Sequence, residues 1–174
     1  DGSQEFSYGL GLGVQEEHLG DDTLISRLSF SWRPNDRFAL NLEVRHFNRK
    51  GWLLHQEDRN MTSFDAEQWT PIVSAEYFIS ARQQLKFSLQ WIGIKAQEKD
   101  FYRVPDRAGD LIEVVKPPGP PDSFSLSQMA LQLRYRWEIA PLSDLFIVYT
   151  RGSNLPDNSF FTFQDLFDQA WNDR

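Results

Sequence analysis

A strict two-residue alternation opens the chain. Phe6, Tyr8, Leu10, Leu12 and Val14 alternate with serine, glycine and glutamine, so that every second residue is apolar. Successive side chains point to opposite faces only in a β-strand, and this segment is therefore predicted to be a strand with one apolar face. The same alternation returns in segment after segment as far as Tyr149. We predict an all-β, antiparallel fold.

Seven strands are predicted from this alternation. They cover about residues 5–15, 23–33, 38–46, 69–79, 85–91, 128–139 and 145–151. Short connections at 34–37, 80–83 and 140–144 alternate with longer loops at 46–67 and 97–123, and the link at 17–22 is an exception to this alternation. The second of the long loops carries a proline-rich run that cannot join a sheet. Short turns at one end of the strands and long loops at the other are typical of outer-membrane β-barrels.

Charged residues gather on the face opposite the apolar one. This predicted lumen-facing set consists of Arg27, Arg33, Glu43, Arg45, Glu76, Lys86, Arg134, Arg136 and Glu138. An apolar outer face and a polar inner face indicate a transmembrane β-barrel. Two interpretations of the charges are open: a lumen that attracts anions, or cross-strand ion pairs that stiffen a small or plugged barrel. We favour the ion pairs, because opposite charges on neighbouring strands usually pair with each other.

Aromatic side chains stand near both ends of the predicted strands. Trp32, Phe38, Tyr77, Trp137 and Phe146 lie beside the short turns, and Trp69, Trp91 and Tyr149 lie toward the long loops. Two such groups at two depths are typical of the aromatic belts that flank the lipid-facing band of a barrel.

The composition narrows the possible functions. The chain has 174 residues, enough for one domain, and no run of about 18 apolar residues that would form a membrane-spanning helix. A net charge of -7 argues against a nucleic-acid partner. The chain contains no cysteine, and its acidic loop residues lack the spacing of a calcium-binding loop. We therefore predict neither a metal site nor a cofactor.

Residues suited to catalysis are sparse. His55, followed by Glu57 and Asp58 and close to Ser63, could form a hydrolase site at the outer rim, since a base and a nucleophile must meet in space. No Gly-x-Ser-x-Gly or His-Glu-x-x-His motif accompanies them. We do not expect an enzyme.

The last segment changes from strand to helix periodicity. Thr162 and Asp165 form a predicted capping box, and apolar residues follow on one face of a helix. We therefore divide the chain into barrel strands and loops at 1–153 and an outer loop with a short amphipathic helix at 154–174. Seven antiparallel strands leave two unpaired edges, which lipid does not tolerate. We expect a segment of a larger barrel, closed by further strands of the same chain or by another chain.

Three stretches, at 28–35, 134–152 and 166–171, carry a resemblance to a known family. They resemble the carboxy-terminal outer-membrane β-barrel domain of unknown function that follows a family-9-like carbohydrate-binding module in Bacteroidetes-type envelope proteins. The resemblance covers most of the chain, and its motifs specify architecture rather than chemistry. It implies a Gram-negative outer membrane, an upstream β-sandwich module and a closing strand after Arg174. No sugar-binding role carries over, because the module is not in this chain.

The expected function is that of an outer-membrane anchor or pore in a larger envelope protein. The expected partners are outer-membrane lipid and lipopolysaccharide, the remaining strands of the barrel or another chain, and other members of an envelope protein complex. The alternative is a soluble β-barrel or sandwich that binds a ligand or a protein, with its apolar face packed inward. Aromatic belts at both strand ends favour the membrane, because a soluble core does not need them.

Overall fold

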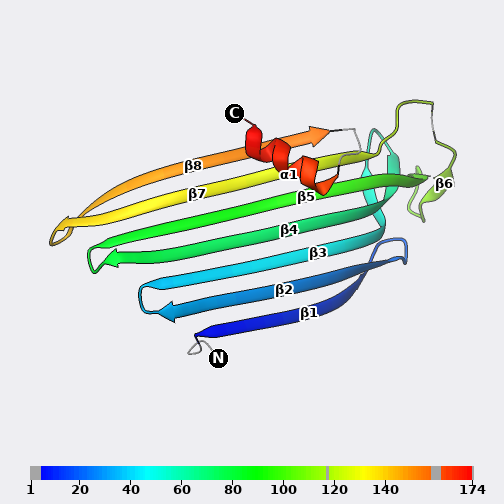
Figure 1. Ribbon diagram of the computed structural model, residues 1–174. Helices are drawn as coiled ribbons and strands as arrows, with labels where there is room; N and C mark the ends of the chain where they lie inside the picture. The colour runs from blue at the N-terminus through cyan, green and yellow to red at the C-terminus, as the bar shows by residue number, and fades with distance from the viewer. Residues whose placement is uncertain (1–4, 117, 158–161, 174) are drawn as a thin grey trace.

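The computed structural model describes residues 5–116, 118–157 and 162–173. These residues form one antiparallel sheet and one short helix (Figure 1). The elements are β1 (Phe6–Glu16), β2 (Asp22–Asn35), β3 (Phe38–His55), β4 (Asn60–Ser80), β5 (Gln83–Arg103), β6 (Ile112–Val114), β7 (Phe124–Ala140), β8 (Ser143–Asp157) and α1 (Phe163–Asn172).

Each long strand pairs with the next along the chain. The order is β1-β2-β3-β4-β5-β7-β8, and β6 pairs with the end of β5. The prediction of an all-β, antiparallel fold is confirmed, with eight strands rather than seven because β6 forms within a predicted loop. The sheet is not closed, since β1 and β8 are its two edges in the described part of the chain. Figure 1 shows the short turns after β2, β4 and β7 together at one end of the sheet.

The prediction of a long loop over 46–67 is wrong. β3 and β4 extend through it and leave only a tight turn at 56–59. A register shift between Arg49 and Trp52 interrupts the alternation there, because a β-bulge places an extra residue in one strand. Gly51 occupies this bulge with a φ of 64°, a left-handed conformation that favours glycine.

The predicted loop over 97–123 is also partly strand. β5 continues to Arg103, and β6 pairs with that end of β5. Of the proline-rich run, residues 118–121 lie outside the strands, as predicted, and residue 117 is outside the described residues.

Helix α1 has the predicted capping box. The backbone N–H of Asp165 donates to the Thr162 Oγ1 (3.2 Å), and the backbone N–H of Thr162 donates to the Asp165 carboxylate (3.1 Å). A hydrogen bond from the Thr162 hydroxyl lowers the pKa of Asp165. The strand before the helix, β8, runs beyond the predicted boundary at 153, and residues 158–161 are not described.

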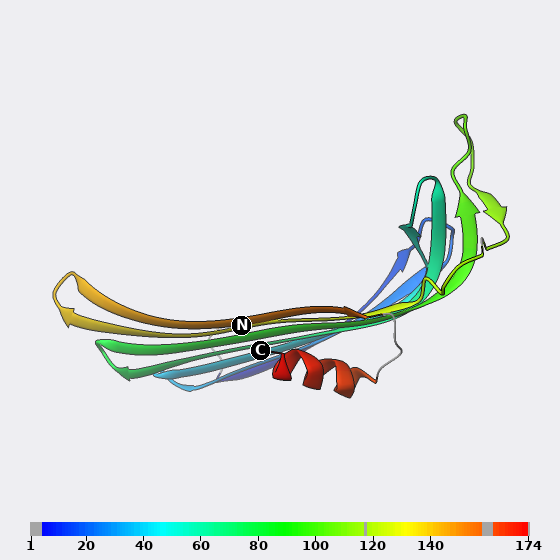
Figure 2. The same cartoon turned by 90° about the horizontal axis from the view of Figure 1, so that it is seen from above.

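Two apolar clusters form the core, one on each face of the sheet. The first joins α1 to β5 and β7 through Trp91, Met129, Leu166 and Ala170. The second gathers around the fully buried Phe64, with Ala66 and Ala96, where β3, β4 and β5 extend past the helix. In Figure 2, α1 lies below the sheet and these strand ends turn upward, away from it.

Candidate functional site

The register sorts the side chains of all seven long strands into two faces of opposite character. One row of neighbours on the apolar face consists of Phe6, Trp32, Leu40, Ala75, Phe87, Leu133 and Tyr149. The adjacent row on the other face consists of Ser7, Ser31, Asn41, Ser74, Ser88, Gln132 and Thr150. Residues that oppose each other in an antiparallel ladder share a face. A wholly apolar row therefore runs beside a row of hydrogen-bonding side chains.

The nine predicted lumen-facing charges lie on the second face, here called the charged face. Several of them pair across strands, as the favoured interpretation requires. Glu43 accepts from Arg27 on β2 and from Arg45 on its own strand, each at 2.5 Å. Glu138 and Asp144 oppose each other at the turn end, and Arg136 pairs with Asp144 at 3.0 Å.

The remaining charges surround a hollow of about 300 Å³ in the middle of this face. Glu76, Lys86 and Arg134 stand side by side on β4, β5 and β7, and Arg33 reaches the same hollow from β2. The Lys86 ammonium lies 3.2 Å from the Glu76 carboxylate, which also accepts a hydrogen bond from Gln84.

The residues of the predicted aromatic belts do not all lie on one face of the sheet. Trp32, Phe38, Tyr77 and Trp137 stand on the apolar face near the short turns, and the rings of Trp32 and Phe38 meet edge to face at 5.6 Å. Phe146 opposes Arg136 and therefore lies on the charged face.

The aromatic residues predicted near the long loops are placed in three different ways. Trp69 is on the apolar face, beside His46. Trp91 is buried beneath α1, and its Nε1–H donates to the Ser127 Oγ (2.9 Å), whose hydroxyl donates to the Leu166 carbonyl (2.6 Å). Tyr149 shares a register row with Trp32, so the register does not separate the two belts there.

The character of the two faces reverses partway along the strands, a feature that the sequence interpretation missed. Beyond Trp69 and Trp91 the apolar face turns polar, and one row across five strands consists of Asn48, Glu67, Lys95, Ser125 and Asp157. On the charged face the change is opposite. There the neighbouring row includes Ala66, Ala96 and Phe124, next to the buried Phe64. The signal was present in β5, where Ser88 and Gln90 give way to Ile92 and Ile94.

The reversal falls at the same level on four strands. His46, Trp69, Gly93 and Ser127 form one register row, in which Trp69 is the one large apolar side chain. The next row on the same four strands, Asn48, Glu67, Lys95 and Ser125, is wholly polar. Here α1 crosses the apolar face, with Phe163 close to Gly93. A side chain at Gly93 would collide with the Trp91 ring, so glycine makes room for the packing of Trp91 beneath the helix.

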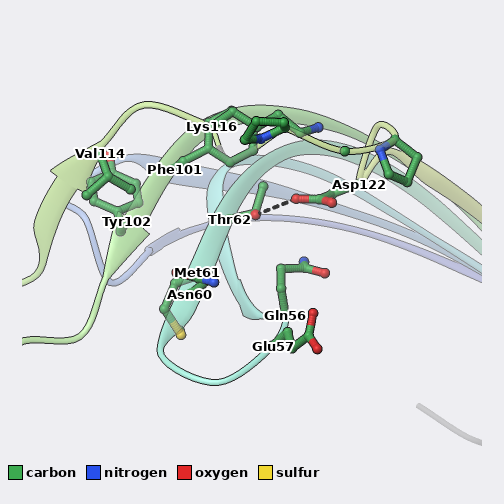
Figure 3. A pocket seen from close by; sticks show the side chains of 13 residues that line it. Gln56, Glu57, Asn60, Met61, Thr62, Phe101, Tyr102, Val114, Lys116 and Asp122 are labelled. Atoms are coloured by element: carbon green, nitrogen blue, oxygen red, sulfur yellow. Dashed lines mark hydrogen bonds between the residues drawn. The ribbon is translucent and has the colours of Figure 1, made fainter.

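A second hollow, of about 280 Å³ and here called the outer hollow, lies among the strand ends that are farthest from the short turns (Figure 3). The Thr62 hydroxyl donates to the Asp122 carboxylate across it (2.8 Å). The hollow mixes apolar, amide and charged side chains, and it is lined by Gln56, Glu57, Asn60, Met61, Thr62, Phe101, Tyr102, Val114, Lys116, Pro118, Gly119, Pro120 and Asp122.

The residues weighed for hydrolysis lie near this hollow but are not joined to one another. The His55 Nε2 lies 2.9 Å from the backbone carbonyl of Asp58. Ser63 is buried, and its Oγ accepts from the backbone N–H of Asp100 at 3.0 Å. The two groups therefore engage backbone atoms in different places.

Glu98 fixes the loop that closes the outer hollow. Burial raises the pKa of its carboxyl, but hydrogen bonds from the Lys116 ammonium and from the backbone N–H of Asp122 (2.6 Å) outweigh burial and leave the pKa below its ordinary value of 4.5. The carboxylate is therefore the favoured form, and it ties both ends of the 116–122 segment to β5.

Replacing Glu98 by glutamine is expected to destabilise this end of the chain at pH 7 by about 1–2 kcal/mol, the range for hydrogen bonds to a partly screened charged group. A carboxyl whose folded pKa is depressed stabilises the fold above its unfolded pKa, and this contribution is lost as the pH falls through the folded pKa. The difference between variant and wild type should therefore vanish in acid. Limited proteolysis of the 104–123 segment between pH 7 and pH 3 measures it. Glu57→Gln is the control, because Glu57 makes no ion pair among the described residues, and an equal change there would contradict the assignment.

A family model described as a domain of unknown function (DUF5916) matches residues 1–173. The chain belongs to this family. No curated protein and no solved structure matches the chain. Family membership agrees with one part of the resemblance noted in the sequence, the domain of unknown function. The outer-membrane barrel and the upstream carbohydrate-binding module, which the resemblance also implies, stay predictions.

The described residues of this DUF5916 member contain no group of three or more His, Asp or Glu side chains arranged to hold a metal ion. Their one helix, α1, lacks the length and hydrophobicity that crossing a membrane would require.

Proposed function

We propose that this chain is the outer-membrane β-barrel portion of a larger envelope protein, and that it acts as a membrane anchor or pore. The observation that carries the proposal is the reversal of the two faces along the strands. A barrel wall in lipid needs an apolar outside and tolerates a polar inside. Where the same wall rises into water, the outside must be polar and the inside can pack an apolar core. Both conditions hold on the same strands, with the change at the row of Trp69.

The length of the apolar part supports this assignment. On β4 the apolar face runs from Trp69 to Tyr77. These nine residues meet the lower end of the 9–11 residues that a tilted strand needs to cross a bilayer. The complete strand, Asn60–Ser80, is about twice as long, so its other half lies outside the lipid. Glu98 on β5 and the outer hollow lie at the level of this other half of β4.

The soluble alternative accounts less well for the apolar face. A soluble sheet buries its apolar face against a second layer. Here α1 covers only part of β5, β7 and β8, and Leu10 on β1 remains 75% exposed. Ile147 on β8 is likewise 59% exposed. Lipid would cover both, together with the rest of the band.

The two sheet edges define the partners that the proposal needs. β1 and β8 each present one row of backbone groups without a strand partner in the described residues, and such groups are not tolerated in lipid. Further strands of the same protein, or another chain, complete the barrel. Lipid and lipopolysaccharide contact the apolar band. The resemblance to barrel domains that follow a carbohydrate-binding module agrees with this arrangement.

Heat-modifiable gel mobility of the full-length protein, extracted from the envelope, tests the proposal. A closed barrel resists detergent until boiled, so the unboiled sample is expected to run faster than the boiled one. An unchanged mobility, together with release from the envelope by an alkaline wash, would contradict the proposal and favour a soluble protein with a bound partner.

A further inference from the structure

The hollow in the middle of the charged face has an excess of cations. Its charged lining consists of Arg33, Lys86 and Arg134 against the single carboxylate of Glu76. Glu76 is already engaged by Lys86 and Gln84. Neither Arg33 nor Arg134 makes an ion pair among the described residues.

This excess of positive charge is local, and it contrasts with the net charge of -7 on the whole chain. Elsewhere on the charged face the arginines form ion pairs: Arg27 and Arg45 share the carboxylate of Glu43, and Arg136 pairs with Asp144. An adjoining hollow shares Arg33 and Glu76 and adds one charge of each sign, from Arg37 and Asp36, so that it leaves the excess unchanged. The hollow thus carries two arginines, Arg33 and Arg134, that make no ion pair among the described residues.

Hydrogen-bond donors complete the lining. Asn41, Ser74, Ser88 and Gln132, members of the polar row, lie along one side of the hollow. Hydroxyl and amide groups can donate to the oxygens of an anion, while arginine forks bind phosphate and carboxylate groups through paired hydrogen bonds. The lining comes from five strands, β2, β3, β4, β5 and β7, whose positions the sheet register fixes.

We propose that this hollow binds a small soluble oxyanion that carries phosphate or carboxylate groups. A lipid headgroup does not reach it, because the charged face is the opposite side of the sheet from the apolar band. The inference rests on the proposed function for its setting, in which the hollow lies on the wall of the lumen and the anion is a solute that enters or crosses it.

Isothermal titration calorimetry of the detergent-purified full-length protein with inorganic pyrophosphate tests the site, and citrate serves as the carboxylate probe. Saturable binding that weakens with added NaCl is expected for at least one probe. Arg33→Gln and Arg134→Gln should each lower the affinity about tenfold or more, the effect of losing charge-assisted hydrogen bonds.

Arg45→Gln is the matched control. This substitution makes the same change of charge on the same face, but Arg45 already pairs with Glu43. It stands four residues along β3 from Asn41, the nearest residue of that strand that lines the hollow. This is about 13 Å, beyond the screening length of about 10 Å in 0.1 M salt. We expect less than about a twofold change in affinity for this variant.

The outcomes separate the site from the proposed function. No binding of either probe, or an equal loss in all three variants, overturns the site. Heat-modifiable mobility is measured on the same samples. A mobility shift without binding refutes the oxyanion site and leaves the barrel standing. Binding that depends on Arg33 and Arg134 without a mobility shift keeps the site and refutes the barrel.

Discussion

Replacing Leu133 by arginine is expected to abolish assembly of the protein in the outer membrane. Leu133 stands on the apolar face of β7, between Phe87 on β5 and Tyr149 on β8. It lies near the middle of the apolar band, where a lipid-facing arginine costs about 2–4 kcal/mol. The reduced share of full-length protein in the outer-membrane fraction, and the loss of its fast unboiled band, measure the effect.

The neighbouring residue supplies the control. Gln132 belongs to the polar row on the charged face, between Ser88 and Thr150. Arginine there would face the predicted lumen, so Gln132→Arg should assemble at close to the wild-type level. Equal tolerance of arginine at both positions would contradict a lipid-facing band, and equal loss would contradict a polar lumen.

The half of the sheet that was predictable from the sequence is the half with uninterrupted alternation. Along β7 the register keeps Leu131, Leu133 and Tyr135 on one face without a bulge, so a period of two suffices to place them. Pairing between nearest strands follows because the turns between them are short. Both the fold class and the composition of the two faces therefore follow from local sequence.

The outer half was hidden by two physical causes. Bulges near Gly51 and between Thr62 and Phe64 shift the phase of the alternation. In addition, the reversal of the faces places charged residues such as Lys95 where an apolar residue is expected, so a strand resembles a loop. If the apolar phase is allowed to change within one strand, the alternation extends β5 as far as Ala96. Residues 97–100 are polar on both faces, so alternation does not reach the end of the strand at Arg103.

The candidate site shows a similar division between local and long-range information. Alternation alone places Arg134 and Lys86 on the charged face. Which arginines form ion pairs depends on the register between strands. Arg27 pairs with Glu43 on the adjacent strand, whereas Arg33 makes no ion pair among the described residues. Phe146 was misplaced because β8 is apolar on both faces near its start, and alternation cannot choose between them.

Replacing Phe64 by alanine is expected to destabilise the outer half of the sheet by about 3–5 kcal/mol, the usual cost of truncating a buried aromatic side chain. Phe64 is fully buried on the charged face, where its ring meets Phe124 edge to face at 5.5 Å and packs near Trp52. Urea unfolding of the full-length protein, refolded in phospholipid vesicles, measures the free energy, and proteolysis of the β3–β4 hairpin reports the local loss.

The residue beside it tests whether the faces reverse at this level. Asp65 lies on the opposite face, where its partly exposed carboxylate pairs with Lys50 at 3.1 Å and accepts a long hydrogen bond from the backbone N–H of Gly51 (3.4 Å). A solvent-screened pair contributes about 0–1 kcal/mol and so long a hydrogen bond adds little, so Asp65→Ala should cost about 1 kcal/mol or less. In the half of the sheet proposed to face lipid, the sensitive residue is on the apolar face, at Leu133, whereas here it is on the charged face. A larger loss of stability for Asp65→Ala than for Phe64→Ala would refute the reversal and, with it, the proposed membrane boundary at Trp69.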